Sequence, residues 1–195
     1  GAGTTRVFDD LDVLTATRSY LYRVIVEDSC GIPVLTSNQA TSINLVAEAG
    51  VDGINRLRWN GYVEWAGAVM HYDIYRSVAN EPFILLATNA SGNWEFNDDV
   101  NAFIGSNGKF CYYVEAYEGG NPSGINAVST SNIACAVQPE AIWIPNAFIQ
   151  GSGGGKNNYF KPVFAFVDVK GYELIIYNRW GQEIWSSTDP EQPWF

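Results

Sequence analysis

The sequence predicts an all-β fold built from antiparallel β-sandwiches. Runs such as YLYRVIV (20–26) and FCYYVEAY (110–117) alternate side chains between two faces, as strands do. Turn sequences such as VDG, NGY and GGNPSG recur between the runs, and no segment has a helical period. Short strands separated by frequent turns are typical of an antiparallel sandwich.

Individual strands indicate which side chains form the core. In INRLRWNGY (54–62), the alternation places Leu57 and Trp59 on the inward face. In MHYDIYRS (70–77), it places Tyr72 and Ile74 inward and His71 outward. We therefore interpret His71 as a surface residue, since no second histidine exists to share a site with it.

The chain contains an internal repeat with an offset of about 90 residues. Residues 7–41 and 95–135 both run through an aromatic residue, an Asp-Asp pair, an aromatic-rich strand, an acidic turn and the sequence TSN. We expect residues 1–40 to be the last strands of a sandwich domain whose front is missing. Residues 41–139 are expected to form a complete second domain.

Composition argues against several classes of function. The net charge of -10 disfavours nucleic acid and anionic lipid as partners. No stretch approaches the roughly 20 apolar residues of a membrane-spanning helix, so we expect no transmembrane segment of its own. One histidine and three cysteines without a CxxC pair disfavour a zinc site or a histidine-based triad. We predict a protein that is not an enzyme and has no metal or cofactor.

Two paired carboxylates recur at one position of the repeat, Asp9-Asp10 and Asp98-Asp99. Such pairs could bind calcium or act as acid and base. They could equally occupy a turn before the tyrosine-rich strand, where Asp accepts backbone hydrogen bonds. We favour the turn, because a duplicated catalytic pair would be unusual.

The cysteines suggest one disulfide bond. Cys111 opens one predicted strand and Cys135 closes the next. If these strands pair in antiparallel order, the two cysteines lie near each other across the ladder, and an exported compartment would permit the bond. Cys30 lies in a turn without an evident partner.

Tryptophans offer an alternative function. Trp65, Trp94 and Trp143 are expected to be partly exposed, and aromatic surfaces can stack on sugars. Core and interdomain packing is the commoner use of tryptophan, and we favour it here.

The sequence FIQGSGGGKNNYF (148–160) does not match a phosphate-binding loop. Such a loop needs G-x-x-x-x-G-K-[ST], whereas Gln150 occupies the first glycine position and Asn157 follows Lys156. The segment also lacks Asp and Glu, the ligands that calcium favours. We expect a flexible connection without a metal.

Residues 41–139 resemble a fibronectin type III domain. The resemblance rests on LRW, YDIYRS, YYVEAYEGGNPSG and STSN. It implies that Trp59 is the core tryptophan and that Tyr112 is the tyrosine near the strand corner. The partial first copy resembles the last strands of the same family.

Residues 140–195 resemble the gliding-motility-associated, type B sorting domain of the type IX secretion system of Bacteroidota. The blocks IPNAF, a Gly/Asn loop, FKP, YELIIYNRWGQEIW and TDPEQPW match in order and spacing. The resemblance implies a small Ig-like β-sandwich, here truncated with its last strands missing, that addresses a large cargo to the outer membrane. The loop lacks the aspartates that relatives carry, which puts cation binding there in doubt.

The expected function follows from both resemblances. We expect the C-terminal region of a large secreted cell-surface protein, an adhesin, that is exported through the outer membrane to the cell surface or the extracellular space. Its partners would be the type IX translocon and an outer-membrane shuttle β-barrel protein. The fibronectin-like modules would serve as spacers or bind a surface glycan or another cell-surface ligand.

Nine residues carry the most specific part of the sorting motif. They are the candidates for recognition by the translocon or shuttle, although they could equally serve to shape the fold: Ile144, Pro145, Asn146, Ala147, Phe148, Asn178, Arg179, Trp180 and Gly181. The alternative function is a glycan-binding accessory region of an exported polysaccharide-degrading enzyme.

Overall fold

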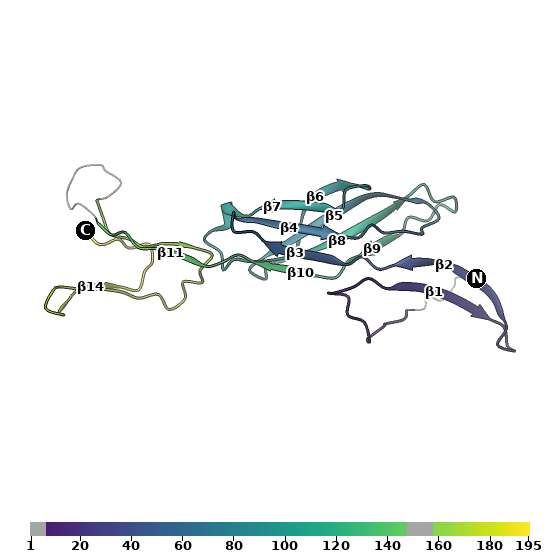
Figure 1. Cartoon of the computed structure of the whole chain (residues 1–195), viewed down its shortest axis with the longest axis horizontal. Coiled ribbons are helices and arrows are strands. Elements are labelled where there is room, and N and C mark those ends of the chain that lie inside the picture. The colour runs from purple at the N-terminus through teal and green to yellow at the C-terminus, as the bar shows by residue number, and fades with distance from the viewer. Residues whose placement is uncertain (1–6, 148–157) are drawn as a thin grey trace.

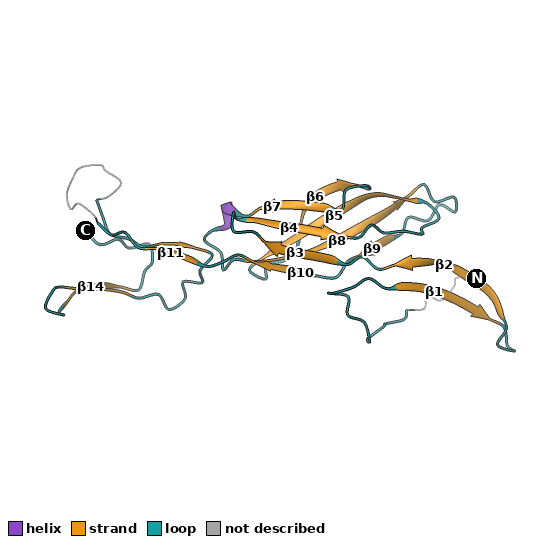
Figure 2. Ribbon diagram, in the orientation of Figure 1, coloured by secondary structure: helices purple, strands orange, loops and turns teal. Residues whose placement is uncertain are grey.

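The chain is almost entirely antiparallel β-structure in its computed structural model (Figures 1 and 2), which describes residues 7–147 and 158–195. Within those ranges there are fourteen strands, one 3-10 turn and no α-helix. This confirms the all-β, antiparallel class expected from the alternating pattern. In the described part of the chain, no helix is long and apolar enough to cross a bilayer.

Two sheets pack face to face in the middle of the chain (Figure 2). The smaller sheet has the order β3-β4-β7, with β3 (Leu45–Ala49), β4 (Ile54–Trp59) and β7 (Glu95–Asp99). The larger has the order β10-β8-β5-β6, and β9 also pairs with β8. Its strands are β5 (Ala68–Val78), β6 (Ile84–Ala90), β8 (Lys109–Gly119), β9 (Val128–Thr130) and β10 (Ala134–Val137). A 3-10 turn, η1 (Asn101–Phe103), precedes β8.

The core lies between these sheets and follows the predicted alternation. Leu57 and Trp59 of β4 are buried, and so are Tyr72 and Ile74 of β5. The Trp59 and Tyr72 rings meet edge to face at 5.7 Å, which joins the two sheets. His71 is half-buried on the outer face, as its parity requires.

A buried polar network crosses the core. Arg76 of β5 donates to the Asp98 carboxylate of β7 at 2.8 Å, and the Tyr112 hydroxyl donates to the same carboxylate at 2.7 Å. Asn55 donates to the Tyr112 hydroxyl, and Gln138 donates to Asn55, each at 2.7 Å. Burial, together with Asp98, raises the pKa of Tyr112 well above its ordinary value. Both sheets and the end of the sandwich are thus tied by one chain of hydrogen bonds.

The turn predicted for Asp98-Asp99 is wrong for Asp98. Strand β7 continues through Asp99, so the Asp98 side chain points inward and pairs with Arg76. Only Asp99 behaves as expected, since its carboxylate accepts the backbone N–H of Asn101 at 3.0 Å. Arg76, in the sequence YRS, is buried in the core, and the carboxylate of Asp98 neutralises its positive charge.

The N-terminal hairpin repeats hydrogen bonds of the sandwich. It consists of β1 (Leu21–Glu27) and β2 (Pro33–Thr41). The Ser37 hydroxyl accepts the N–H of Val24 at 2.9 Å, just as Ser131 accepts the N–H of Val114 at 2.9 Å. The Tyr22 hydroxyl also donates to Asp10, as Tyr112 does to Asp98.

The two copies differ in what covers them. Val24 is 65% exposed, whereas its counterpart Val114 is fully buried under the smaller sheet. The same difference separates Tyr22, at 39% exposure, from the fully buried Tyr112. The hairpin therefore presents to solvent the face that forms the core in the second copy.

The rest of the chain is called here the C-terminal unit, residues 141–147 and 158–195, and lies at the opposite end from β1 and β2 (Figure 1). It contains two separate pairs of strands. One pair is β11 (Ala141–Trp143) with β12 (Val163–Ala165), and the other is β13 (Leu174–Tyr177) with β14 (Glu183–Ser187). The second pair is the predicted hairpin, with its turn at residues 178–181.

Candidate functional site

The first group of predicted recognition residues directly follows β11. Ile144, Asn146 and Ala147 are exposed, and Pro145 is half-buried. Phe148 lies outside the described residues, as does the glycine-rich loop to residue 157.

A small apolar hollow lies beside these residues. It has a volume of about 200 Å³ and is lined by Asn146, Ala147, Phe160, Ile176 and Trp194. Phe160 and Trp194 form a backbone bridge across it, with reciprocal N–H to carbonyl bonds of 2.8 and 3.0 Å. Part of the IPNAF segment is therefore held next to β13 and the chain's end.

The second group forms a tight turn whose shape is set by Asn178. The Asn178 side-chain oxygen accepts the backbone N–H groups of Trp180 at 2.9 Å and Gln182 at 3.0 Å. Gly181 has a φ of 80°, which a residue with a Cβ rarely adopts. The side chains at the tip remain outside, with Trp180 71% exposed and the Arg179 guanidinium 4.2 Å from its ring centre.

The structure does not bring the two groups into one site. None of the turn residues 178–181 lines the hollow beside Asn146; from this hairpin, only Ile176 of β13 contributes to the lining. The free end of the β14 hairpin also lies apart from β11 (Figure 1). The motif thus supplies two surfaces on one unit, a rigid aromatic turn and an apolar hollow.

The C-terminal unit is anchored in the sandwich core. Phe166, directly after β12, is only 6% exposed and packs edge to face on Phe110 of β8 at 6.2 Å. Its N–H donates to the Ile104 carbonyl at 2.7 Å, and its φ of 57° is unusual for a bulky residue. Gly108 makes room for it, since a Cβ there would lie 2.8 Å from the Phe166 Cβ. Sequence reasoning missed this anchor.

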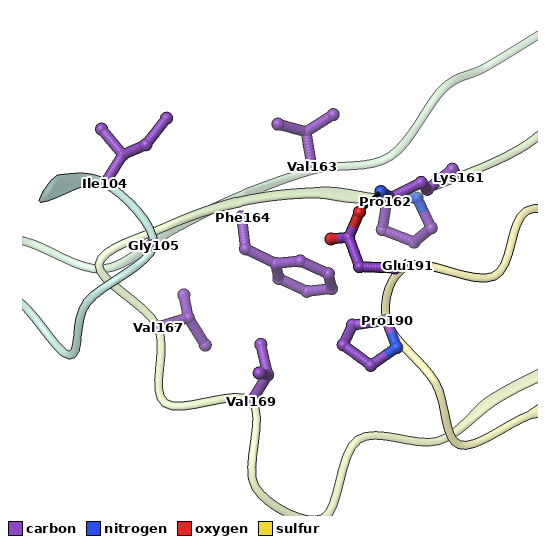
Figure 3. Close-up of a pocket in the computed structure, with 10 residues that line it drawn as sticks. All are labelled: Ile104, Gly105, Lys161, Pro162, Val163, Phe164, Val167, Val169, Pro190 and Glu191. Carbon is purple, nitrogen blue, oxygen red and sulfur yellow. Dashed lines mark hydrogen bonds and ion pairs between the residues drawn. The ribbon is translucent and has the colours of Figure 1, made fainter. Parts of the chain in front are cut away.

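A second hollow, of about 230 Å³, lies at this junction (Figure 3). The Phe164 ring points into it beside Val167, Val169 and Pro190, and Ile104 and Gly105 of the sandwich border it. The Lys161 ammonium and the Glu191 carboxylate form an ion pair at one end. The rest of the lining is mainly apolar, and the two charged side chains pair with each other.

Cys111 and Cys135 form a disulfide bond. They are direct partners in the β8–β10 register, with Cα atoms 4.0 Å apart and an S–S distance of 2.06 Å. Cys30 is the free cysteine of the described ranges and is exposed at the tip of the β1–β2 turn.

An aromatic ladder on the outer face of the larger sheet also escaped the sequence analysis. His71 stacks on Tyr117 at 4.7 Å, and Tyr75 stacks on Tyr113 at 4.6 Å. The Tyr117 hydroxyl donates to Glu115 at 2.9 Å, and this bond is the main reason why its pKa is raised. The alternation could have predicted this ladder, because it places His71 and Tyr75 of β5 and Tyr113 and Tyr117 of β8 on the outer face of the same sheet.

The three flagged tryptophans differ in their surroundings. Trp65 is half-buried and its ring lies 4.1 Å from that of Tyr62, centre to centre. Trp94 is 50% exposed and Trp143 is 57% exposed. Trp65 thus serves packing, while the other two present ring surface to solvent.

No group of three or more His, Cys, Asp or Glu side chains suited to a metal occurs in residues 7–147 and 158–195. The Asp9-Asp10 pair is exposed or half-buried, and Asp10 instead accepts the Tyr22 hydroxyl at 3.2 Å. No protein-family model, curated protein or solved structure matches this chain.

Proposed function

We propose that this chain is the C-terminal region of a large secreted cell-surface adhesin, and that its C-terminal unit is the signal for export through the type IX secretion system. The observation that carries the proposal is the turn at residues 178–181. Its shape is fixed by Asn178, while Arg179 and Trp180 stay exposed. A surface that is rigid and uncovered suits recognition, because little ordering is needed on binding.

Recognition by strand addition is consistent with this unit. Strands β13 and β14 pair only with each other within the described ranges, so each leaves one edge without a strand partner. A partner protein could add a strand there, and side-chain hollows would supply specificity. The apolar hollow beside Ala147 and Ile176 is placed to accept such a side chain.

The sandwich supports the fibronectin-like assignment of residues 41–139. Trp59 and Tyr112 lie in the core, as the resemblance implies. The matching hydrogen bonds of Ser37 and Ser131 support a tandem pair of such modules. We propose that these modules are spacers or interaction domains, with no catalytic role.

The disulfide is in keeping with an exported protein. Such bonds persist in oxidising compartments and are rare in the cytosol of most cells. Cys111 and Cys135 therefore favour an extracytoplasmic location, at the cell surface or beyond it.

The test is a fusion to a periplasmic reporter in a cell with a type IX system. The fusion should run from residue 41 to the native C-terminus of the protein, because Phe166 packs into the sandwich core and the C-terminal unit lacks that support alone. A matched fusion with residues 41–169 keeps Phe166 in the sandwich core and lacks the β13–β14 hairpin with its turn. We expect the first reporter at the surface and the second in the periplasm. A first reporter that stays periplasmic contradicts the proposal.

The alternative function, a glycan-binding accessory region of a polysaccharide-degrading enzyme, is favoured by one observation, the half-exposed ring of Trp94. The two functions are compatible in one chain, since export is assigned to the C-terminal unit, whereas Trp94 lies beside β4 and β7 of the sandwich.

A further inference from the structure

A hollow of about 360 Å³ lies where β4 ends and β7 begins. Its volume falls at the low end of the roughly 300–1,000 Å³ of small-molecule sites. Six residues line it: Arg58, Trp59, Gly92, Asn93, Trp94 and Glu95. Trp94 provides its exposed apolar surface, and Arg58, Asn93 and Glu95 provide its polar groups.

The Trp94 ring is fixed in position before any ligand arrives. Its indole N–H donates to the Ser91 carbonyl at 3.1 Å. Its ring lies against Gly61, where a Cβ would come within 2.8 Å of the ring. With one side supported and the single polar atom engaged, the half-exposed ring offers an apolar surface that needs no reordering.

Two charged groups beside the ring have no ion-pair partner among the described residues. Arg58 and Glu95 are register neighbours on β4 and β7, yet no ion pair joins them to each other or to another described residue. By contrast, Arg56 of the same strand forms an exposed ion pair with Asp52 of the preceding turn, with an N–O distance of 2.6 Å. Next to Trp94, a guanidinium donor and a carboxylate acceptor therefore remain available.

We propose that this hollow binds one pyranose ring of a neutral glycan. The C–H face of the sugar would stack on the Trp94 indole. The Glu95 carboxylate would accept hydrogen bonds from sugar hydroxyls, and the Arg58 guanidinium would donate to them. Glu95 and the net charge of -10 disfavour a phosphorylated or acidic ligand.

The experiment is an NMR titration of the purified 195-residue chain, labelled with nitrogen-15. The probes are cellohexaose, xylohexaose, mannohexaose and chitohexaose. We expect at least one of them to shift the Trp94 indole N–H signal saturably. The backbone amide signals of Gly92, Asn93 and Glu95, which line the hollow, report binding in every variant. By these signals, Trp94→Ala should weaken the binding by about tenfold or more, as expected for a central aromatic anchor.

Two further variants keep the result interpretable. Glu95→Gln alters one exposed side chain, so it should fold normally and still weaken binding severalfold. Trp143→Ala removes a similarly exposed tryptophan outside the hollow and should leave binding unchanged.

Three results would overturn the proposal. One is the absence of any saturable shift of Trp94 with all four probes. Another is wild-type affinity in a folded Glu95→Gln variant together with wild-type affinity in Trp94→Ala. The third is loss of binding in Trp143→Ala alone. Because the assay uses purified protein, none of these results depends on the export route.

Discussion

The buried pair of Arg76 and Asp98 provides the sharpest stability prediction. Asp98→Asn keeps the size of the side chain and removes its charge. The Asp98 and Arg76 side chains are only 5% and 8% exposed, so the guanidinium is left charged with little water to solvate it. Removing one partner of such a pair costs about 3–5 kcal/mol.

The expected loss is large relative to the stability of a sandwich of this size. At about 4 °C per kcal/mol, the lower bound corresponds to a fall in Tm of about 12 °C. Calorimetry or circular dichroism on the whole chain measures it. Asp99→Asn is the matched control, because Asp99 is exposed and the amide oxygen can still accept the Asn101 N–H. That variant should stay within about 0.5 kcal/mol of wild type.

A double variant separates the charge from the packing. Arg76→Gln combined with Asp98→Asn removes both charges, so it should be more stable than Asp98→Asn alone. The reasoning is refuted if Asp98→Asn unfolds at the same temperature as Asp99→Asn. It is also refuted if the double variant has a lower Tm than Asp98→Asn alone.

Three further predictions concern other parts of the fold. In a Cys30→Ser background, replacing Cys111 and Cys135 by Ser opens a disulfide with a sequence separation of 24 and should cost about 3 kcal/mol in urea unfolding; an unchanged midpoint would contradict this. Gly108→Ala should loosen the attachment of the C-terminal unit, because φ at this position is 73° and the added Cβ would contact Phe166. Limited proteolysis near residue 160 should therefore become faster. Gly105→Ala, which has open space around its Cβ position, should leave the rate of proteolysis unchanged. Burial raises the pKa of Tyr72 and Tyr112, so their contribution to stability is present below about pH 10, the ordinary tyrosine pKa, and is lost as the pH rises through their folded values. Unfolding midpoints that stay constant from about pH 9 to 12 would count against that linkage.

Local pattern predicted the strands well, because alternation is a property of neighbouring residues. Leu57, Trp59, Tyr72 and Ile74 occupy the positions that parity assigns them. The Cys111–Cys135 bond also follows from an antiparallel register of two adjacent segments. In both cases the deciding interaction lies within one sheet.

Interactions between sheets and units were not predictable in the same way. Arg76 shares the parity of Tyr72 and Ile74, which was a signal that it lies inside. Its neutralisation by Asp98 depends on how two strands of different sheets face each other, which sequence spacing does not specify. Phe166 enters the core of the preceding sandwich through a turn with positive φ, and no local pattern marks that contact.

The same distinction applies to the candidate recognition residues. Their positions in a turn and after a strand followed from NRWG and IPNAF, since Gly and Asn have known turn chemistry. The separation of the two groups into a turn and a hollow is a tertiary property and emerged only from the fold.

The most direct test of the central proposal is the dependence of surface display on the type IX translocon. The reporter fused to the segment from residue 41 to the native C-terminus should be measured by surface protease accessibility in two strains, one with the translocon and one with its translocon deleted. The proposal predicts a surface-accessible reporter in the first strain and a protected, periplasmic reporter in the second. Equal accessibility in both strains would contradict it, because export would then proceed without recognition of the C-terminal unit.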